Sequence, residues 1–384
     1  MRRYDIVVIG AGISGATLAE RYAKLGQKVL VLEKRDHIGG NCYDFYNDDG
    51  ILVSKYGAHL FHTNFEDVWH YVNKFSRWYP HEHHVLAKVD GKLVPIPVNI
   101  TTVNRLFNLK ITTEEEMRNF LDQVQIKNPD PRNGEEAALA RVGNVLYEKM
   151  FKHYTKKQWD KYPHELDASV LQRIPVRTNF DDRYFSDKYQ ALPLHGYAKL
   201  FETMLSHDNI TLRLNTDYFD VRSSREVQEC RKVFYAGPID RFFDYMHSSV
   251  RKLQWRSIRF EWMTLDQEFF QENSVVNYPD PLDGDYTRIV EYKHFTRQKH
   301  PKTTISREYT TDEGDPYYPV PNRENEEISQ LYREEADKLP NVHFVGRLAN
   351  YKYFNMDQAF KNALDLFTQL EGRIEPVAMQ PQPW

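Results

Sequence analysis

The sequence predicts an α/β protein: a parallel-sheet domain with an inserted helical domain and an antiparallel β-sheet domain. An apolar run, a glycine-rich turn and a helix open the chain. Helix-patterned segments follow from about residue 99, and short β-like runs from about residue 210. The 384 residues also exceed the size at which single cores stop growing, about 250–300 residues. We therefore expect three regions and a disordered tail: 1–98 completed by 342–370, then 99–200, 201–341 and 371–384.

The composition excludes several classes of protein. The net charge is −4, and this near-balance argues against a dedicated binder of nucleic acid or of membrane surfaces. Two cysteines cannot form a disulfide framework in a chain of this size, which favours a reducing, cytoplasmic compartment. The apolar N-terminal run leads into a glycine turn, and no run of about 20 apolar residues follows, so we expect neither an export signal nor a membrane helix. Tyrosine outnumbers glycine, 25 to 17, which suggests sites that stack rings and bind phosphates.

The first forty residues have the pattern of a Rossmann-like βαβ unit. The runs at 5–9 and 28–32 are apolar and β-branched, as in buried parallel strands, and 14–25 have a helical packing face. Gly26 follows the helix, as a C-terminal glycine does. The order strand, turn, helix, strand therefore predicts a nucleotide-binding unit.

The turn of this unit carries a dinucleotide fingerprint. Gly10, Gly12 and Gly15 have the G-x-G-x-x-G spacing, which allows a tight turn and close approach of the backbone to a pyrophosphate at the helix N-terminus. Glu33 lies 21 residues beyond Gly12, close to the roughly 20 expected for a carboxylate that binds the ribose. These residues predict a bound dinucleotide.

The second region is predicted to be mainly helical and the third mainly β. Thr113 and Glu116 have the spacing of a capping box that starts a helix at 114–125, and a longer helix is predicted at 135–152. A last helix is predicted at 355–370. The β-like runs, whose spacing is typical of an antiparallel sheet, are 211–214, 233–236, 258–263, 288–292, 303–307 and 342–345.

Two further matches favour FAD over NAD. The Gly39-Gly40 pair soon after Glu33 resembles the extended FAD motif of flavoproteins of the glutathione-reductase-2 type. Near the C-terminus, Gly346-Arg347 follows a β-run and Met356-Asp357 opens the last helix, as in the segment with which that superfamily contacts the flavin. With the family resemblance given next, the expected FAD-binding residues are Gly10, Gly12, Ser14, Gly15, Glu33, Lys34, Arg35, Gly40, Asn41, Gly57, His59, Arg347, Met356 and Asp357.

Several longer sequence motifs are typical of one protein family. They include 56–63 (YGAHLFHT), 151–159 (FKHYTKKQW), 173–177 (RIPVR) and 346–353 (GRLANYKY). Together they resemble the prokaryotic UDP-galactopyranose mutases, over about residues 4–370. The resemblance implies a substrate-facing lid in 99–200, a flavin-facing sheet in 201–341 and a homodimer.

The resemblance implies a non-redox reaction that interconverts UDP-galactopyranose and UDP-galactofuranose. Reduced FAD is expected to attack the anomeric carbon through its N5 atom while UDP leaves. The flavin–sugar iminium then recloses through the other hydroxyl, and UDP returns.

The resemblance also assigns side chains to this reaction. Arg173, in the lid, and Arg288 match two arginines that clamp the diphosphate, a task that suits a permanently charged, bidentate guanidinium. His62 matches a histidine that faces the flavin near the sugar, and these three residues are the expected catalytic set. The expected substrate-binding residues are Tyr154, Thr155, Trp159, Arg173, Tyr184, Asn277, Arg288, Tyr318 and Tyr353.

The chain departs from the family pattern at a few positions. His83-His84 stands where an Asn is frequent, Met150 where an aromatic is frequent, and Asn355 where an Asp is frequent. The histidines near residue 83 lack the spacing of metal ligands, so we expect no metal site. Two alternatives stay open: a flavin oxidoreductase related to the amine oxidases, and a non-catalytic binding protein like the GDP-dissociation inhibitors.

Overall fold

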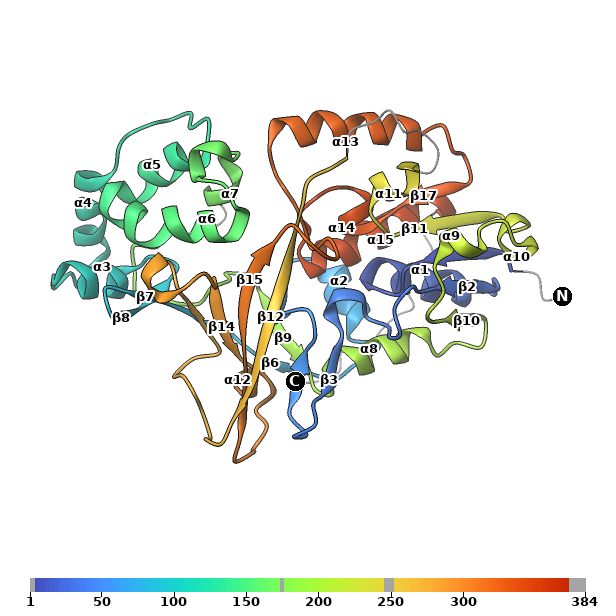
Figure 1. Cartoon of the computed structure of the whole chain (residues 1–384), viewed down its shortest axis with the longest axis horizontal. Coiled ribbons are helices and arrows are strands. Elements are labelled where there is room, and N and C mark those ends of the chain that lie inside the picture. The colour runs from blue at the N-terminus through green and yellow to red at the C-terminus, as the bar shows by residue number, and fades with distance from the viewer. Residues whose placement is uncertain (1–3, 173–175, 245–251, 373–384) are drawn as a thin grey trace.

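The computed structural model describes residues 4–172, 176–244 and 252–372. A five-stranded parallel sheet forms one side of the molecule, in the order β10-β2-β1-β11-β17 (Figure 1). Its strands are β1 Ile6–Ile9, β2 Val29–Leu32, β10 Ile210–Arg213, β11 Lys232–Tyr235 and β17 Val342–Phe344. All five strands are parallel, and a buried parallel sheet needs helices on both of its faces. The sheet therefore confirms the predicted α/β class.

Helices cover both faces of the parallel sheet. On one face, α1 (Ile13–Lys24), α8 (Gly196–Leu205) and α15 (Met356–Glu371) pack together around buried residues such as Val8 and Phe360. On the other face, α11 (Ile239–Asp244) and α13 (Arg323–Ala336) share a separate core with the alternate strand residues. The short helices α2 Glu66–Val72, α9 Tyr218–Val221, α10 Arg225–Gln228 and α14 Gly346–Ala349 complete this half.

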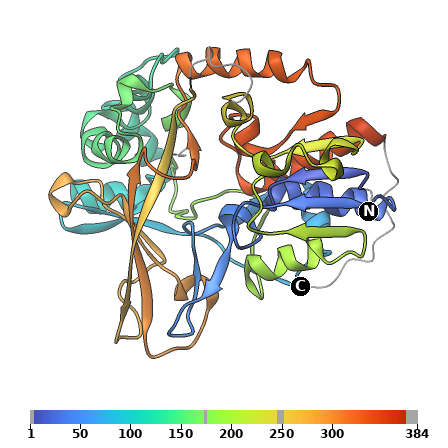
Figure 2. The ribbon, with the colours of Figure 1, turned by 45° about the vertical axis from the view of Figure 1, so that its right-hand side comes forward.

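A seven-stranded mixed sheet forms the centre of the molecule, in the order β16-β12-β15-β14-β13-β7-β8. Neighbouring strands are antiparallel except β13 and β7, which pair in parallel. The long strands β12 and β15 stand apart from the parallel sheet in Figure 2. The strands are β7 Val85–Val89, β8 Lys92–Ile96, β12 Trp255–Leu265, β13 Val275–Asn277, β14 Arg288–Glu291, β15 Thr303–Thr311 and β16 Tyr318–Pro319, with the short helix α12 Lys293–Thr296 after β14.

Three of the β-runs whose spacing suggested an antiparallel sheet lie elsewhere. β10, β11 and β17 belong to the parallel sheet, and for β17 this agrees with the expectation that 342–370 complete the first region. The mixed sheet instead takes in β7 and β8 from the first region. The error has a physical cause: a run of four apolar or β-branched residues has no period that distinguishes one sheet from another. The partner strand is chosen by contacts distant in sequence, and a local pattern does not contain them.

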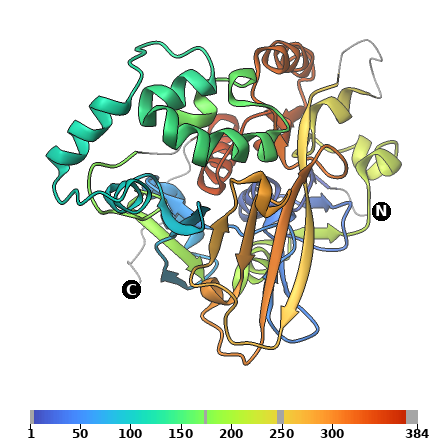
Figure 3. The same ribbon diagram turned by 60° about the vertical axis from the view of Figure 1, so that its left-hand side comes forward.

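A group of helices lies beside the mixed sheet, at the left of Figure 1 and above the strands in Figure 3. The capping box of Thr113 and Glu116 is confirmed at the start of α4, with both reciprocal hydrogen bonds present. The helix predicted at 135–152 is divided, because Gly143 has a φ of 73° and an added Cβ would lie 2.1 Å from the Val124 carbonyl oxygen. The group comprises α3 Ile100–Phe107, α4 Glu114–Val124, α5 Gly134–Leu146, a π-helical turn Tyr147–Lys152, α6 His153–Trp159 and α7 Ser169–Gln172.

Two small sheets connect these parts. β9 (Tyr189–Pro193), inside the stretch expected to be helical, pairs with β5 (Phe61–Thr63) and β6 (Trp78–Pro80). β3 (Asp44–Tyr46) and β4 (Leu52–Ser54) form a hairpin. β5 and the loop directly before β9 carry residues used below, so this three-stranded sheet positions part of the site.

Candidate active site

The turn between β1 and α1 is built so that the backbone can approach a ligand. Gly10 has a φ of 98°, and a Cβ on Gly15 would lie 1.9 Å from the Gly10 carbonyl oxygen, so neither position accepts a side chain without strain. Helix α1 has no side-chain cap and no acidic residue in its first turn. Its first N–H groups and its positive dipole end are therefore available to an anion.

Glu33, at the end of β2, is held against this turn. One carboxylate oxygen accepts a hydrogen bond from the Ala11 backbone N at 2.8 Å, and the other accepts from the Arg35 backbone N at 2.9 Å. The side chain is buried, yet a carboxylate offers about four acceptor positions, so lone pairs remain for ribose hydroxyls. The geometry fits the role predicted from the spacing.

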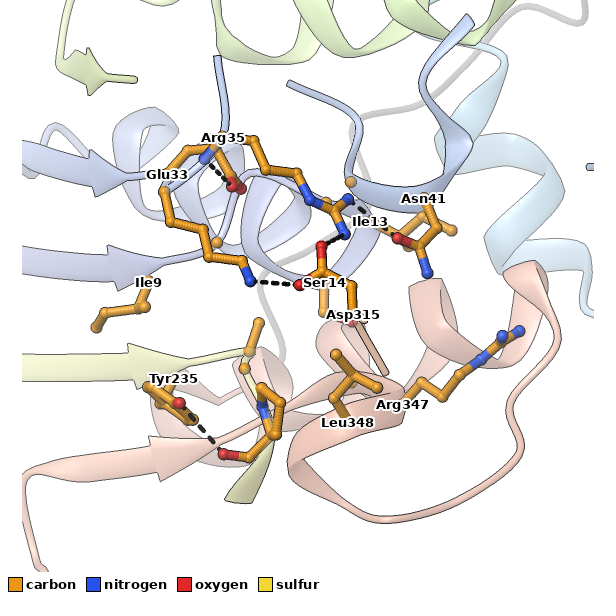
Figure 4. A pocket seen from close by; sticks show the side chains of 18 of the residues that line it. Ile9, Ile13, Ser14, Glu33, Arg35, Asn41, Tyr235, Asp315, Arg347 and Leu348 are labelled. Atoms are coloured by element: carbon orange, nitrogen blue, oxygen red, sulfur yellow. Dashed lines mark hydrogen bonds and ion pairs between the residues drawn. The ribbon is translucent and has the colours of Figure 1, made fainter. Parts of the chain in front are cut away.

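A cavity of about 1230 Å³ opens in front of the turn, and Figure 4 shows its lining side chains. Its walls include most of the residues expected to bind FAD: Gly10, Gly12, Ser14, Glu33, Lys34, Arg35, Gly40, Asn41, His59, Arg347 and Met356. Gly15, Gly57 and Asp357 lie behind the wall, where Gly15 allows the close packing of the turn and Asp357 is buried at the start of α15. The uncapped helix end, the held carboxylate and the glycine walls fit a dinucleotide such as FAD.

Lys34 and Arg35 point across the mouth of this cavity to Asp315. The Lys34 ammonium lies 2.8 Å from one carboxylate oxygen of Asp315, and the Arg35 guanidinium lies 2.8 Å from the other. Arg35 also donates to Asn41 Oδ1 at 3.0 Å and lies over the Tyr56 ring at 4.3 Å (Figure 4 shows the Asp315 and Asn41 contacts). Sequence reasoning missed Asp315, because no local pattern places residue 315 beside residue 34.

A second cavity, of about 800 Å³, shares His59 with the first. The His59 Nδ1 lies 2.9 Å from the Gly57 carbonyl oxygen, which accepts only, so Nδ1 is the donor. Burial lowers the pKa of His59 to about 4, so the imidazole is neutral at physiological pH. Tyr79, Tyr197 and Tyr292 give this second space aromatic walls.

Arg288 is the centre of the predicted substrate site. It lies opposite Glu308 in the pairing of β14 with β15, and Nε is 3.0 Å from Glu308 Oε2. Burial opposes the charge of Arg288, but Tyr154, Glu308, Tyr318 and Tyr184 around it raise its pKa, so it stays a cation. About 28% of its side chain remains exposed, against 4% for Glu308, so the cation rather than the carboxylate can reach a ligand.

Aromatic rings join Arg288 to the cofactor cavity. Tyr318 and Tyr353 stack with centroids 5.2 Å apart and 12° between their planes, and Trp159 lies 6.5 and 6.3 Å from them. The Arg347 guanidinium, which also lines the cofactor cavity, lies 5.7 and 5.2 Å from the two stacked rings. The structure thus brings together side chains predicted from separate motifs, and it places them beside the dinucleotide site.

Unsatisfied polar atoms border the same cluster. Asn277 lies opposite Arg288 in the pairing of β13 with β14, and its Oδ1 is buried without a hydrogen-bond partner among the described residues. His83 Nδ1 is also buried and has no hydrogen-bond partner among the described residues. Burial, followed by nearby His81, His84, Arg288 and His62, lowers the pKa of His83 to about 3. A buried polar group without a partner costs about 1–3 kcal/mol, so these atoms indicate a place for ligand hydrogen bonds.

His62 lies on β5 and is oriented by two neighbours from the segment after Tyr184. Its Nδ1 is 2.9 Å from Asp187 Oδ2, and its ring stacks on Phe185 with centroids 3.6 Å apart. His62 also affects the pKa of Asp357, which burial raises and His62 lowers. Sequence reasoning missed Asp187 and Glu308, because each acts through a partner distant in sequence.

The remaining predicted residues divide into two groups. Thr155 is buried in α6, next to Tyr154, as the motif requires. Arg173 lies outside the described residues, as do Ile174 and Pro175 of the predicted lid. Residues 373–384 of the predicted tail lie outside them as well. In the described ranges no group of His, Cys, Asp and Glu side chains is arranged to hold a metal ion, and no helix there is long and apolar enough to cross a bilayer.

Known proteins share both the sequence and the fold. A family model for UDP-galactopyranose mutase matches residues 149–353, more than half of the chain, and a model for an NAD(P)-binding Rossmann-like domain matches 8–75. A probable UDP-galactopyranose mutase of Klebsiella pneumoniae is 36% identical over 369 residues, which cover 95% of this chain and 94% of its own. A dTDP-fucopyranose mutase of Escherichia coli is 37% identical over 367 residues, 94% of this chain and 96% of its own.

A crystal structure of a reduced UDP-galactopyranose mutase has the same fold, with a TM-score of 0.77 over 96% of each chain at 15% identity. The sequence matches span nearly the whole of this chain, and they include the segments that form the aromatic and arginine cluster. The chain therefore belongs to the UDP-galactopyranose mutase family and is an isomerase.

Proposed function

We propose that this enzyme interconverts UDP-galactopyranose and UDP-galactofuranose with FAD as its cofactor. The observation that carries the proposal is the cluster of Arg288 with Tyr154, Tyr184 and Tyr318. It supplies one permanent cation and several phenol groups beside the dinucleotide cavity, and those groups suit a nucleoside diphosphate. An oxidoreductase would need no such diphosphate site, and a cofactor-free binding protein would need no held Glu33.

Each side chain has a defined task in this proposal. Arg288, with Arg173 of the predicted lid, binds the diphosphate and stabilises the charge that develops as UDP leaves. Hydroxyls of Tyr184, Tyr318 and Tyr353 donate to the phosphate oxygens. The residues proposed to hold the base and sugar are Tyr154, Thr155, Trp159 and Asn277, with His62 beside the sugar.

FAD fits the cavity in front of α1, and its reduced form, when bound, supplies the N5 nucleophile on which the proposed chemistry depends. The protein keeps that chemistry productive by holding the leaving diphosphate close. Departed UDP that stays bound to Arg288 can return to the same carbon, which a mutase requires. A homodimer in the cytoplasm remains our prediction for the assembly and its location.

The E. coli relative introduces a second candidate substrate, dTDP-fucopyranose. That sugar nucleotide differs by a methyl group on the base, by a missing ribose hydroxyl and by a missing hydroxyl on C6 of the sugar. The buried unpartnered atoms Asn277 Oδ1 and His83 Nδ1 favour the substrate with more hydroxyl groups, because a polar site rejects an analogue that leaves it unpaired.

The test follows both substrates under reducing conditions. Purified enzyme is reduced with dithionite, given UDP-galactofuranose or the dTDP-fucose furanose, and the pyranose product is separated by HPLC. We expect conversion of the UDP sugar with the higher kcat/KM. No conversion of either sugar would eliminate the proposal, preference for the dTDP sugar would establish the second candidate, and equal activity of oxidised enzyme would contradict the role of reduced flavin.

A further inference from the structure

A hydrogen-bond chain connects the segment after Tyr184 to His62. The Lys188 backbone N donates to Asn64 Oδ1 at 2.9 Å, and Asn64 Nδ2 donates to Asp187 Oδ1 at 2.9 Å. The second oxygen of Asp187 lies 2.9 Å from His62 Nδ1. Each link is short, and together they join β5 to the loop before β9.

The chemistry of the donors fixes the direction of every link. A backbone N–H can only donate, so the Asn64 atom that it meets is the carbonyl oxygen and the other Asn64 atom is the NH₂ group. That group donates to Asp187, and the carboxylate can only accept. His62 must therefore donate through Nδ1, and in a neutral imidazole the proton is absent from Nε2.

Contacts on other sides restrict the ring further. Phe185 stacks on His62 with 14° between the planes, and only 7% of His62 is exposed. His62 also lies near enough to His83 and Asp357 to affect their pKa values, so its ring is close to the edge of the Arg288 cluster and to the start of α15. The plane of the ring is thus set by Phe185 and its rotation by Asp187.

We propose that Asp187 is a positioning residue that holds His62 as the Nδ1–H tautomer, so that Nε2 presents a hydrogen-bond acceptor in the active site. Through Asn64 and Lys188 the same carboxylate fastens the loop that carries Tyr184. Asp187 itself need not touch the substrate. The kinetic consequence rests on the proposed function, whereas the tautomer does not.

An asparagine at position 187 tests this idea because it is nearly isosteric but has one acceptor and one donor. Asn64 has its NH₂ group toward position 187, so the new amide oxygen faces Asn64 and the new NH₂ group faces His62. His62 Nδ1 must then accept, and its proton moves to Nε2. Replacement of an aspartate that orients a catalytic histidine in this way inverts the tautomer with little change of shape.

The experiment is NMR of ¹⁵N-histidine-labelled holoenzyme, with the His62 signals identified by their loss in His62→Gln. In the neutral ring, wild type should show hydrogen on Nδ1, and Asp187→Asn should show it on Nε2. Glu66→Gln is the matched control, because Glu66 pairs with Lys188 at the surface of the same loop. This control should keep the wild-type tautomer.

Kinetics supply the second readout. Asp187→Asn should lower kcat by about 10²-fold or more with a smaller change in KM, whereas Glu66→Gln should leave both nearly unchanged. An Nε2–H tautomer in wild type, or an unchanged tautomer in Asp187→Asn, would overturn the proposal even if the enzyme is active. If Asp187→Asn does not fold, Asp187→Ala is used instead: it removes the acceptor for Nδ1–H without supplying a donor, so the preference for Nδ1–H should weaken, and an undiminished preference would overturn the proposal. Absence of mutase activity in wild type would count against the proposed function alone.

Discussion

The predicted cofactor site of the parallel-sheet half and the predicted substrate site of the mixed-sheet half differ in whether their buried polar side-chain atoms have hydrogen-bond partners. In the parallel half, both oxygens of Glu33 accept from backbone N–H groups, and buried Glu20 accepts from Arg21 and Tyr71 and pairs with Lys24. Among the described residues, the five parallel strands, α1 and α15 contain no buried unpartnered side-chain atom, although α8, which packs on the same sheet, contains the unpartnered Tyr197 hydroxyl. In the mixed half, Asn277 Oδ1 and His83 Nδ1 are buried without a hydrogen-bond partner among the described residues. The carboxylate of the predicted cofactor site is thus paired within the protein, whereas the predicted substrate site keeps unpaired atoms that a ligand could satisfy.

The largest expected effect comes from removing the cation of the mixed half. Arg288→Met should lower kcat/KM by about 10³-fold, because the diphosphate loses its charged donor. It should also destabilise the fold by about 3–5 kcal/mol, because Glu308 is left buried without its counter-charge. Steady-state kinetics and urea unfolding measure the two effects.

A double variant separates the two effects of Arg288. Arg288→Met with Glu308→Gln removes the uncompensated charge, so stability should return while activity does not. Arg259→Met, which replaces an exposed arginine on β12 on the other side of β15, is the control and should change neither quantity. Recovery of activity in the double variant would show that Arg288 acts through the fold and not through the substrate.

The next largest effect tests how tightly the parallel half is packed. Gly15→Ala should destabilise the protein by about 3 kcal/mol, because its Cβ has no room beside the Gly10 carbonyl oxygen. Gly26→Ala is the matched control, since it has a φ of 77° but open space around its Cβ, and it should cost about 1 kcal/mol. Equal losses of stability would mean that the turn relaxes to admit the new Cβ, and that the close approach of Gly15 to the Gly10 carbonyl is not what requires glycine there.

The two halves also differ in how much the sequence reveals. In the parallel half the turn, the helix and Glu33 are consecutive, so spacing alone predicts the fold and the ribose carboxylate. In the mixed half the site joins β13, β14 and β15 to α6 and β16, and only the resemblance of whole motifs to a family brought Arg288, Tyr154 and Tyr318 together before the structure did. Glu308, Asp187 and Asp315 were not predicted, because each acts through a partner distant in sequence.

A smaller effect is expected when the satisfied carboxylate of the parallel half is changed. Glu33→Gln keeps one acceptor but turns an NH₂ group toward a backbone N–H, so it disturbs the turn and offers fewer lone pairs to the ribose. We expect the Kd for FAD to rise about 10-fold to 30-fold, as for the loss of a charge-assisted hydrogen bond. Flavin fluorescence during reconstitution of the apoprotein measures it. Asp36→Asn, on an exposed side chain nearby, should leave the Kd unchanged.

The last prediction concerns pH and the unsatisfied His83. The pKa of His83 is lowered to about 3, so below about pH 6.5 the unfolded chain binds a proton that the folded protein does not. Stability from neutral His83 is therefore present above about pH 6.5 and is lost as pH falls toward 3, by about 1.4 kcal/mol per pH unit. His83→Asn should reduce the slope of unfolding free energy against pH between 6 and 4 by that amount.

The slope should not vanish in His83→Asn, because burial also lowers the pKa values of His59 and His81 to about 4. An unchanged slope would show that His83 is protonated in the folded protein. It would then follow that Nδ1 already has a hydrogen-bond partner.

Urea unfolding in the presence of saturating UDP compares how a ligand stabilises the two halves. If a ligand completes the mixed half, UDP should stabilise wild type more than His83→Asn, whereas FAD should stabilise both proteins equally.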